Sequence, residues 1–216
     1  MQRLSKLFAT FLGVLLLSNA AAEDSDRRHR DDSQAEASIR ELVRRGAVVK
    51  RFSVRESGTQ GLLVRLKAEH LDARGTIEWR LLGQLQTISD LSLELRGLRF
   101  SDEGLKSLMS NVSPIGLDLS GTAVSDLGLA DLIGPKTRIR LLDLSFTQIS
   151  DDGLRSVAAL RELRYLSLIG SRITDCGMTR LDRLQQLQEI YLAETAVSLQ
   201  AAARLHCKLP LCRIER

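Results

Sequence analysis

Aromatic residues are scarce in this sequence, and neither sign of charge dominates. Phenylalanine, tryptophan and tyrosine together make up 4% of the 216 residues, and 31 basic residues accompany 27 acidic ones. A chain with so few aromatic side chains lacks a platform on which unpaired bases could stack, and a nearly balanced charge attracts phosphate only weakly. The composition therefore predicts no nucleic-acid partner.

Histidine and cysteine are also rare, with three residues of each kind. His206 and Cys207 are adjacent, and no second Cys-x-x-Cys or His-x-x-x-His pair completes the ligand spacing of a zinc site. The sequence contains no nucleophilic triad, phosphate-binding glycine loop or metalloprotease motif. We therefore expect a protein that is not an enzyme and that holds no cofactor and no metal.

The segment 1–22 resembles a secretory signal. Arg3 and Lys6 precede the apolar run Leu7–Leu17, which is too short to cross a membrane as an ordinary helix, and Ala20 and Ala22 suit a cleavage site. We expect a cut after Ala22, export to the periplasm or the extracellular space, and no stable membrane insertion afterwards. An uncleaved membrane anchor is the alternative.

A charged segment follows the expected cleavage site. Removal of the signal lowers the number of basic residues to 29, against 27 acidic ones. Residues 23–37, EDSDRRHRDDSQAEA, contain both signs of charge and show no apolar period. Such a segment cannot bury enough apolar surface to offset its ordering entropy. We expect a disordered leader at 23–37.

An internal repeat organises the rest of the chain. The first position of a Leu-x-Leu motif recurs at a nearly constant interval, as Leu93, Leu117, Leu142, Leu166 and Ile190. Further apolar columns follow two, seven, twelve and fifteen positions later. A spacing of two is strand periodicity, whereas positions twelve and fifteen share one face of a helix. Each unit therefore contributes a strand and a helix to a shared interior that one unit alone could not form.

Polar columns suit the turn from strand to helix. Eight positions after the first leucine, a hydroxyl residue suits a helix N-cap in all five copies: Ser101, Ser125, Ser150, Thr174 and Ser198. Aspartate follows in four copies and places negative charge at the helix N-terminus. Glycine two positions later indicates close backbone packing. Because a catalytic role would not recur in every unit, we interpret these columns as structural.

The stretches LDLSGTAVSDLGL, LDLSFTQISDDGL and LSLIGSRITDCGM resemble leucine-rich repeats. Threonine at the usual asparagine position and the (S/T)-D-x-G-L ending are similar to the cysteine-containing subclass and to related bacterial secreted repeat proteins. The resemblance covers 88–214 and implies an α/β fold, a right-handed leucine-rich repeat solenoid with a curved parallel sheet inside and helices outside. It implies a binding module rather than a particular ligand. Leu199 departs from the aspartate pattern in the last unit.

A solenoid needs a cap at each end of its core. On the N-terminal side we expect a cap with a degenerate first repeat at 38–87. If Val64 begins that repeat, Trp79 falls on a core position and His70 lies in a turn that faces solvent.

The repeats and a final cap strand are expected at 88–216. Ile214 follows Ile190 at the same interval that separates the earlier units, which predicts a last short strand that closes the sheet. Cys207 and Cys212 could form a disulfide between the last helix and this strand in an oxidising compartment. Two separate thiols are the alternative.

The residues that flank each Leu-x-Leu motif form ladders across neighbouring strands, which lie about 4.8 Å apart. Toward the N-terminal repeats, the ladders predict an acidic strip of Glu94, Asp118 and Asp143. Toward the C-terminal repeats, they predict an apolar and aromatic patch of Leu141, Tyr165, Ile169 and Tyr191. Exposed aromatic side chains on a rigid surface are typical of protein-binding hot spots.

We expect an exported module that binds a protein or another macromolecule through its concave sheet. One alternative is a structural or regulatory component of the cell envelope without a dedicated ligand, in which the tyrosines merely suit β structure. Another is Ca²⁺ binding by the three carboxylates of the acidic strip. A substrate receptor for ubiquitin ligation, a role of the resembled subclass, is disfavoured because it needs an adaptor-binding domain and an intracellular location.

Overall fold

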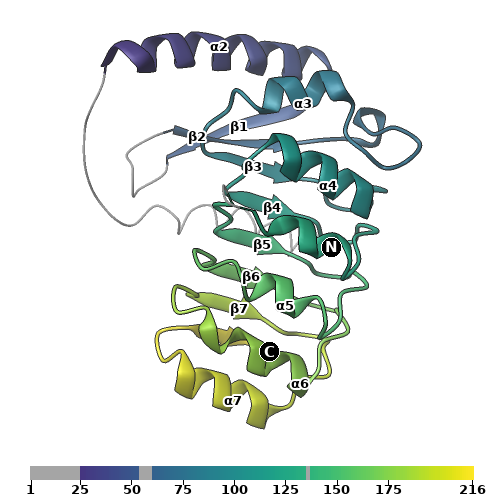
Figure 1. Ribbon diagram of the computed structural model, residues 1–216, viewed down its shortest axis with the longest axis vertical. Helices are drawn as coiled ribbons and strands as arrows, with labels where there is room; N and C mark the ends of the chain where they lie inside the picture. Colours follow the sequence, from purple (N-terminus) through teal and green to yellow (C-terminus); the bar gives the residue numbers. More distant parts are fainter. Residues whose placement is uncertain (1–24, 54–59, 135–136) are drawn as a thin grey trace.

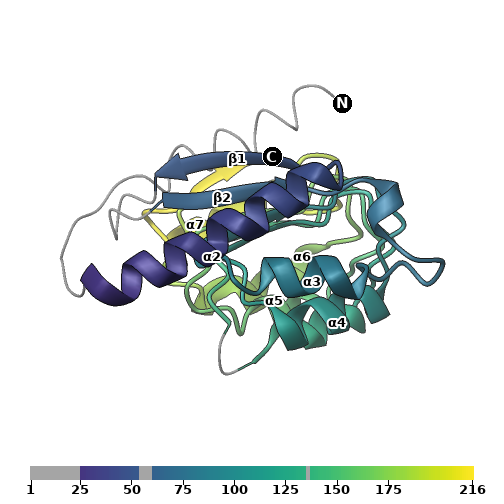
Figure 2. The ribbon, with the colours of Figure 1, turned by 90° about the horizontal axis from the view of Figure 1, so that it is seen from above.

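The computed structural model describes residues 25–53, 60–134 and 137–216, and the expected signal at 1–22 lies outside them. One sheet of eight strands follows the order of the chain from β1 to β8. Strands β2 to β8 are parallel, and β1 pairs with β2 in the antiparallel direction. The strands stack on one side of the molecule and the helices of the repeats lie on the other (Figures 1 and 2). The fold is therefore an α/β leucine-rich repeat solenoid.

The elements are short and regularly spaced. The strands are β1 Val48–Ser53, β2 Gln60–Arg65, β3 Leu91–Glu94, β4 Gly116–Asp118, β5 Leu141–Asp143, β6 Tyr165–Ser167, β7 Glu189–Tyr191 and β8 Arg213–Glu215. The α-helices are α2 Ser25–Arg44, α3 Trp79–Leu85, α4 Asp102–Asn111, α5 Leu154–Val157, α6 Asp175–Met178 and α7 Leu199–Lys208. The described ranges also contain three short 3₁₀ helices: η1 Ala68–His70, η2 Gly128–Leu132 and η3 Thr179–Arg183.

The repeated apolar columns form the core, as the sequence predicts. Leu117 on β4 is fully buried, and so are Leu129 and Leu132 on the helical segment of the same unit. The column seven positions after the first leucine is fully buried in all five units: Phe100, Val124, Ile149, Ile173 and Val197. Each strand and its helix therefore close over one continuous interior that no single unit could bury.

The charged segment from Ser25 onward is helical, which corrects the expected disorder. Helix α2 runs from Ser25 to Arg44, and the sequence contains neither glycine nor proline from residue 23 to residue 45. Near its end, Glu41 forms ion pairs with Arg44 at 2.9 Å and with Arg45 at 2.7 Å. Leu42 is fully buried in the core. The apolar contacts of the last turns anchor a helix whose composition alone favours disorder.

The burial of two residues of the N-terminal cap is the reverse of what the sequence predicts. Trp79 is 73% exposed because α3 begins at this residue and buries Leu81, Leu82 and Leu85 instead. His70 is only 3% exposed. Its Nδ1 accepts a hydrogen bond from the Lys67 amide at 2.8 Å, so its Nε2 carries the proton and donates to the Arg45 carbonyl at 2.8 Å. The histidine therefore links the end of α2 to the turn before α3 through hydrogen bonds.

The hydroxyl column caps the helices and also joins consecutive repeats. Ser101, Thr174 and Ser198 each accept a hydrogen bond from a backbone amide of the following helix, as expected for N-caps. The aspartate column has a role that the sequence does not predict. Each aspartate accepts two hydrogen bonds from the hydroxyl residue of the next repeat, one from its backbone amide and one from its hydroxyl group. The pairs are Asp102 with Ser125, Asp126 with Ser150, Asp151 with Thr174, and Asp175 with Ser198.

The C-terminal strand forms as predicted, but the disulfide does not. Strand β8 pairs with β7 in the parallel direction and places Ile214 opposite Ile190. Cys207 is an exposed thiol on α7, and Cys212 is a buried thiol just before β8. Burial raises the pKa of Cys212 to about 12, and its Sγ lies 3.7 Å from the Arg213 carbonyl. The two cysteines therefore remain separate thiols.

Candidate binding surface

The sheet face opposite the helices carries two ladders of paired residues. We call this side the concave face. In one ladder, Leu63, Ser92, Gly116, Leu141, Tyr165 and Glu189 are direct partners on successive strands from β2 to β7. In the other, the partners are Arg65, Glu94, Asp118, Asp143, Ser167 and Tyr191. The parallel register therefore brings the predicted strip and patch together on one surface.

The apolar patch forms a contiguous cluster, larger than predicted. Leu141, Tyr165, Ile169 and Tyr191 pack with Leu63 and Ile115 as a group separate from the main core, and Phe52 and Ala193 lie against it. Phe146 lies against Gly170 and is not part of this cluster. We call the six residues from Leu63 to Tyr191 that form the group the concave cluster.

The concave cluster is buried, which corrects the expectation of exposed aromatic side chains. Tyr165 is only 2% exposed, and the other five members are also buried. These side chains are therefore not open to solvent in this structure. Alanine substitution of either tyrosine would also remove packing within the chain, so such variants test stability as well as binding.

The two tyrosines keep polar ends within the apolar surroundings. The Tyr165 hydroxyl donates to Gln188 Oε1 at 3.0 Å, and the Tyr191 hydroxyl donates to Glu189 Oε2 at 2.7 Å. Burial raises the pKa of Tyr165 to about 12 and also raises the pKa of Tyr191. Both rings therefore stay neutral near pH 7 and present an apolar body with a hydrogen-bonded tip, as at protein interfaces.

The acidic strip is buried as well. Glu94 forms an ion pair with Arg65 at 2.8 Å. Asp118 Oδ1 accepts from the Ser120 hydroxyl at 2.6 Å and from its amide at 3.0 Å, and Asp143 Oδ1 accepts from the Ser145 amide at 2.9 Å. Burial raises the pKa of Asp118 to about 7, and the Asp143 charge on the next strand adds to the rise. Burial also raises the pKa of Asp143.

The strip does not have the geometry of a calcium site. Within the described ranges, no group of three or more histidine, cysteine or acidic side chains could hold a metal ion. Calcium needs six to eight oxygen ligands, whereas Glu94 is already paired with Arg65 and the two aspartates accept hydrogen bonds from serines. The described side chains therefore give no support to the calcium alternative.

Two members of the concave cluster, Leu63 and Ile115, are not among the residues that the sequence predicts for the patch. Leu63 precedes Val64 in the degenerate first repeat, so extending the ladder by one strand would have found it. Ile115 has no such signal, because the equivalent positions of the next repeats hold Arg140, Arg164 and Gln188.

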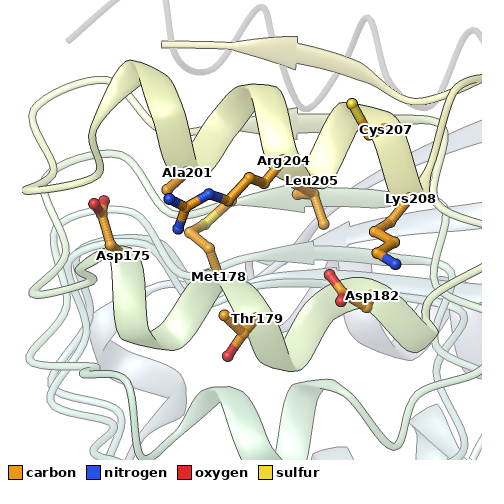
Figure 3. A pocket seen from close by; sticks show the side chains of 9 residues that line it. All are labelled: Asp175, Met178, Thr179, Asp182, Ala201, Arg204, Leu205, Cys207 and Lys208. Carbon is orange, nitrogen blue, oxygen red and sulfur yellow. The ribbon is translucent and has the colours of Figure 1, made fainter.

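A separate cavity lies on the helical side of the molecule. It has a volume of about 280 Å³ and lies between α6–η3 and α7, with Met178, Ala201 and Leu205 on an apolar wall (Figure 3). Asp182, Lys208 and Arg204 lie around it. None of these side chains forms a nucleophile–base pair with another, so the cavity offers space between two helical layers without evident chemistry.

Leucine-rich repeat proteins are among the known proteins that this chain resembles. Residues 138–158 match the family model described as leucine rich repeat. Internalin C2 of Listeria monocytogenes is 25% identical, with a TM-score of 0.44 over 59% of this chain and 52% of that one. A leucine-rich repeat protein of Leptospira interrogans is 17% identical, with a TM-score of 0.40 over 65% of this chain and 34% of that one. This chain thus spans about half and about a third of their lengths.

No curated protein matches the sequence. The matched segment contains β5 and α5 and corresponds to one of the stacked units. The successive strand–helix units have the architecture of leucine-rich repeats, and the family match covers one of these units.

Proposed function

We propose that this leucine-rich repeat chain binds another protein through its concave face. The concave cluster is the observation that supports this proposal. It gathers six apolar side chains, two of them tyrosines, on the side of the sheet opposite the repeat helices. Aromatic anchors within an apolar patch are the usual composition of protein-binding hot spots, and leucine-rich repeat proteins are mostly binding modules. Catalysis has no comparable support.

We propose further that the chain is exported and acts in the periplasm or outside the cell. The support is the order of basic, apolar and small residues within the segment 1–22. No helix of the described ranges is long and apolar enough to span a bilayer. Cell fractionation tests the location, because a cytoplasmic pool would contradict it. Sequencing of the N-terminus of the recovered protein tests the cleavage, because a first residue other than Glu23 would contradict a cut after Ala22.

The unit pattern also supports a closer relation to the cysteine-containing subclass and to related bacterial secreted repeat proteins. The aspartate and glycine columns contact each other between consecutive repeats. Each of Gly128, Gly153 and Gly177 lies against the aspartate of the preceding unit. A methyl group at any of these positions would overlap that carboxylate. The (S/T)-D-x-G-L motif therefore describes contacts between repeats as well as helix capping.

Site-specific crosslinking in the full chain tests the binding face. A photoreactive phenylalanine derivative at half-buried Ala193, beside the concave cluster, should form an adduct with a protein partner in the native compartment. The same derivative at Leu127, which is 83% exposed in the helical segment of its repeat, is the matched control. Mass spectrometry of the adduct identifies the partner for purification.

Calorimetry with the purified partner then completes the test. Ala193→Arg places a long cation at the edge of the concave cluster and should weaken binding by roughly tenfold or more, whereas Leu127→Arg should leave the affinity unchanged. Equal affinities for both variants would contradict binding through this face. A native compartment that yields no adduct at Ala193 would favour the alternative of an envelope component without a dedicated ligand.

A further inference from the structure

The outer edge of the last strand, β8, has no pairing partner within the described ranges. Strand β8 pairs with β7 on one side, and no other described strand lies along its second edge. The other end of the sheet is covered, because α2 lies over it (Figure 1) and Glu36 of α2 forms an ion pair with Arg51 of β1. An open strand edge is a template for pairing with another chain. The edge of β8 is therefore a candidate interface.

The backbone of β8 has one pair of hydrogen-bonding groups at this edge. The Arg213 amide donates to the Gln188 carbonyl at 2.7 Å. The Glu215 carbonyl accepts from the Leu192 amide at 2.7 Å, so residues 213 and 215 both direct backbone groups toward β7. Successive residues of a strand direct these groups to opposite sides. The amide and the carbonyl of Ile214 therefore point to the outer edge, where two antiparallel copies of this residue can exchange both hydrogen bonds.

The side chains of β8 are complementary to a second copy of the same strand. Arg213 and Glu215 flank Ile214, share one face of the sheet and form an ion pair within the chain. An antiparallel pairing centred on Ile214 places Arg213 of each copy directly opposite Glu215 of the other. Opposite charges in such positions stabilise a strand pair, and like charges destabilise it. A parallel pairing in register would place like charges opposite each other, so the sequence of β8 favours the antiparallel direction.

Exposed leucines lie near this edge. Leu199 is 68% exposed, and Leu211, just before β8, is 94% exposed. Leu199 occupies the position that holds an aspartate in the four preceding units, such as Asp175, and each of those aspartates binds the next unit. The last unit of a solenoid normally has a polar outer face. Here an apolar side chain stands at the position that contacts a following unit elsewhere in the fold.

The antiparallel direction also brings these leucines to the same end of the interface. Arg216 Nε donates to the Val197 carbonyl at 2.7 Å, so the end of β8 lies beside the start of α7, where Leu199 is located. Leu211 precedes the start of β8. In an antiparallel pair the end of one strand lies beside the start of the other. Leu199 of each copy and Leu211 of the other therefore lie on the same side of the pair.

We propose that a second copy of this chain binds at the edge of β8, and that the two β8 strands pair in the antiparallel direction about a twofold axis at Ile214. Both copies use the same surface, so the assembly closes at the dimer. The pairing joins two eight-stranded sheets into one. It does not involve the concave cluster and is independent of the proposed function.

Reversal of the two charges tests the pairing on the full chain. Arg213→Glu alone places like charges opposite each other at both positions, and Glu215→Arg alone does the same. Each single variant should dimerise roughly tenfold more weakly than the unchanged chain. The double variant, Arg213→Glu with Glu215→Arg, restores opposite charges and should dimerise as the unchanged chain does. Sedimentation equilibrium measures the dissociation constants, and thermal melts confirm that each variant is folded.

A mixture of the two single variants sharpens the test. One chain then has two acidic side chains at the edge and the other has two basic ones, so the mixture should form a heterodimer more tightly than either variant forms a homodimer. Arg155→Glu is the matched control, because it reverses an exposed charge on α5 that pairs with Asp152. It should leave dimerisation unchanged.

The apolar part of the interface has its own pair of variants. Leu199→Asp should weaken the dimer, whereas Leu127→Asp, at a leucine that is 83% exposed in another unit, should not. A chain that remains monomeric at high concentration, single charge variants that dimerise as tightly as the unchanged chain, or assemblies larger than the dimer would each overturn the proposal. Crosslinking at Ala193 decides the proposed function separately from all of these results.

Discussion

The carboxylate of Asp151 accepts two hydrogen bonds from Thr174 in the next repeat. Its Oδ1 lies 2.8 Å from the Thr174 amide and its Oδ2 lies 2.6 Å from the Thr174 hydroxyl. The same pair of bonds recurs at the other three junctions from Asp102 to Ser198, and at the N-terminal cap the Arg74 and Gly75 carbonyls accept from Ser101 instead. The hydroxyl residue therefore caps its own helix and binds the preceding unit, which couples the formation of neighbouring repeats.

Loss of one junction should lower stability. Asp151→Ala removes both acceptors and leaves the Thr174 amide and hydroxyl without them, so we expect a loss of about 1–3 kcal/mol in the free energy of unfolding. Asp152→Ala is the matched control, since this neighbour is exposed and bridges only surface arginines, with an expected change below about 1 kcal/mol. Urea denaturation measures both. Equal losses would show that the junction contributes no more than a surface ion pair.

Substitution within the glycine column should lower the free energy of unfolding even when the added side chain is a single methyl group. Gly153→Ala would place a methyl group against Asp126 Oδ1 and close to Ile149 Cγ2, at 3.0 Å. Because the Gly153 φ angle of −61° is an ordinary helical value, the cost is one of space, and we expect a loss of about 1–3 kcal/mol.

Gly83 offers the matched comparison for that substitution. It lies within α3 with no neighbouring atom within 4 Å of an added Cβ, so Gly83→Ala should raise the free energy of unfolding by up to about 1 kcal/mol. Thermal denaturation of the two variants provides the measurement. Stabilisation by Gly153→Ala would contradict close packing at the junction.

Glu194 adopts a left-handed backbone conformation that favours glycine. Its φ angle is 59°, and the equivalent positions of three other repeats hold Gly97, Gly121 and Gly170. Glu194→Gly should therefore stabilise the protein by roughly 1 kcal/mol, whereas Glu194→Ala keeps the strain and should not. Denaturant midpoints distinguish the two. A midpoint for the alanine variant as high as that of the glycine variant would show that the side chain, and not the backbone, determines the effect.

The buried Asp118 should make stability depend on pH. Its folded-state pKa of about 7 lies above the ordinary value of 3.8, so folding favours the protonated form. This contribution is complete below about pH 4 and is lost as the pH rises through 7, by at most about 1.4 kcal/mol per pH unit. Relative to Asp118→Asn, the unchanged chain should lose stability over this window. Urea denaturation between pH 4 and 8 tests it, and parallel curves for the two proteins would contradict the expected burial.

Ser120→Ala tests whether the Ser120 hydroxyl contributes to this pH dependence. The Ser120 hydroxyl donates to Asp118 Oδ1 at 2.6 Å and stabilises the charged carboxylate. Its removal should raise the pKa of Asp118 further and extend the loss of stability to higher pH. A window that shifts to lower pH would show that the hydroxyl does not stabilise the charge.

The stacking of the units follows from residues that repeat at a fixed spacing. Leu117, Leu129 and Leu132 are buried as predicted, and Ile214 pairs with Ile190 as their spacing requires. Such contacts join a unit to itself or to its neighbour, so their geometry is the same in every copy and appears as a column in one sequence. The acidic strip and most of the concave cluster could be located for the same reason.

Positions without a repeated partner could not be predicted in this way. Trp79 lies outside the core and His70 inside it because α3 begins at the tryptophan and the histidine links two cap segments. The unpartnered hydroxyl of Ser92 has no counterpart among the described residues of the other units.

The sequence by itself therefore determined the solenoid, its number of consecutive units and the residues that flank each strand. Only the tertiary structure decided that the concave side chains are buried, that Asp118 holds its proton up to about pH 7, and that Cys207 and Cys212 stay apart. The physical reason is that periodicity reports which way a side chain points from its own strand. Burial, electrostatic environment and the approach of two thiols depend on segments that are distant in the chain and follow no period.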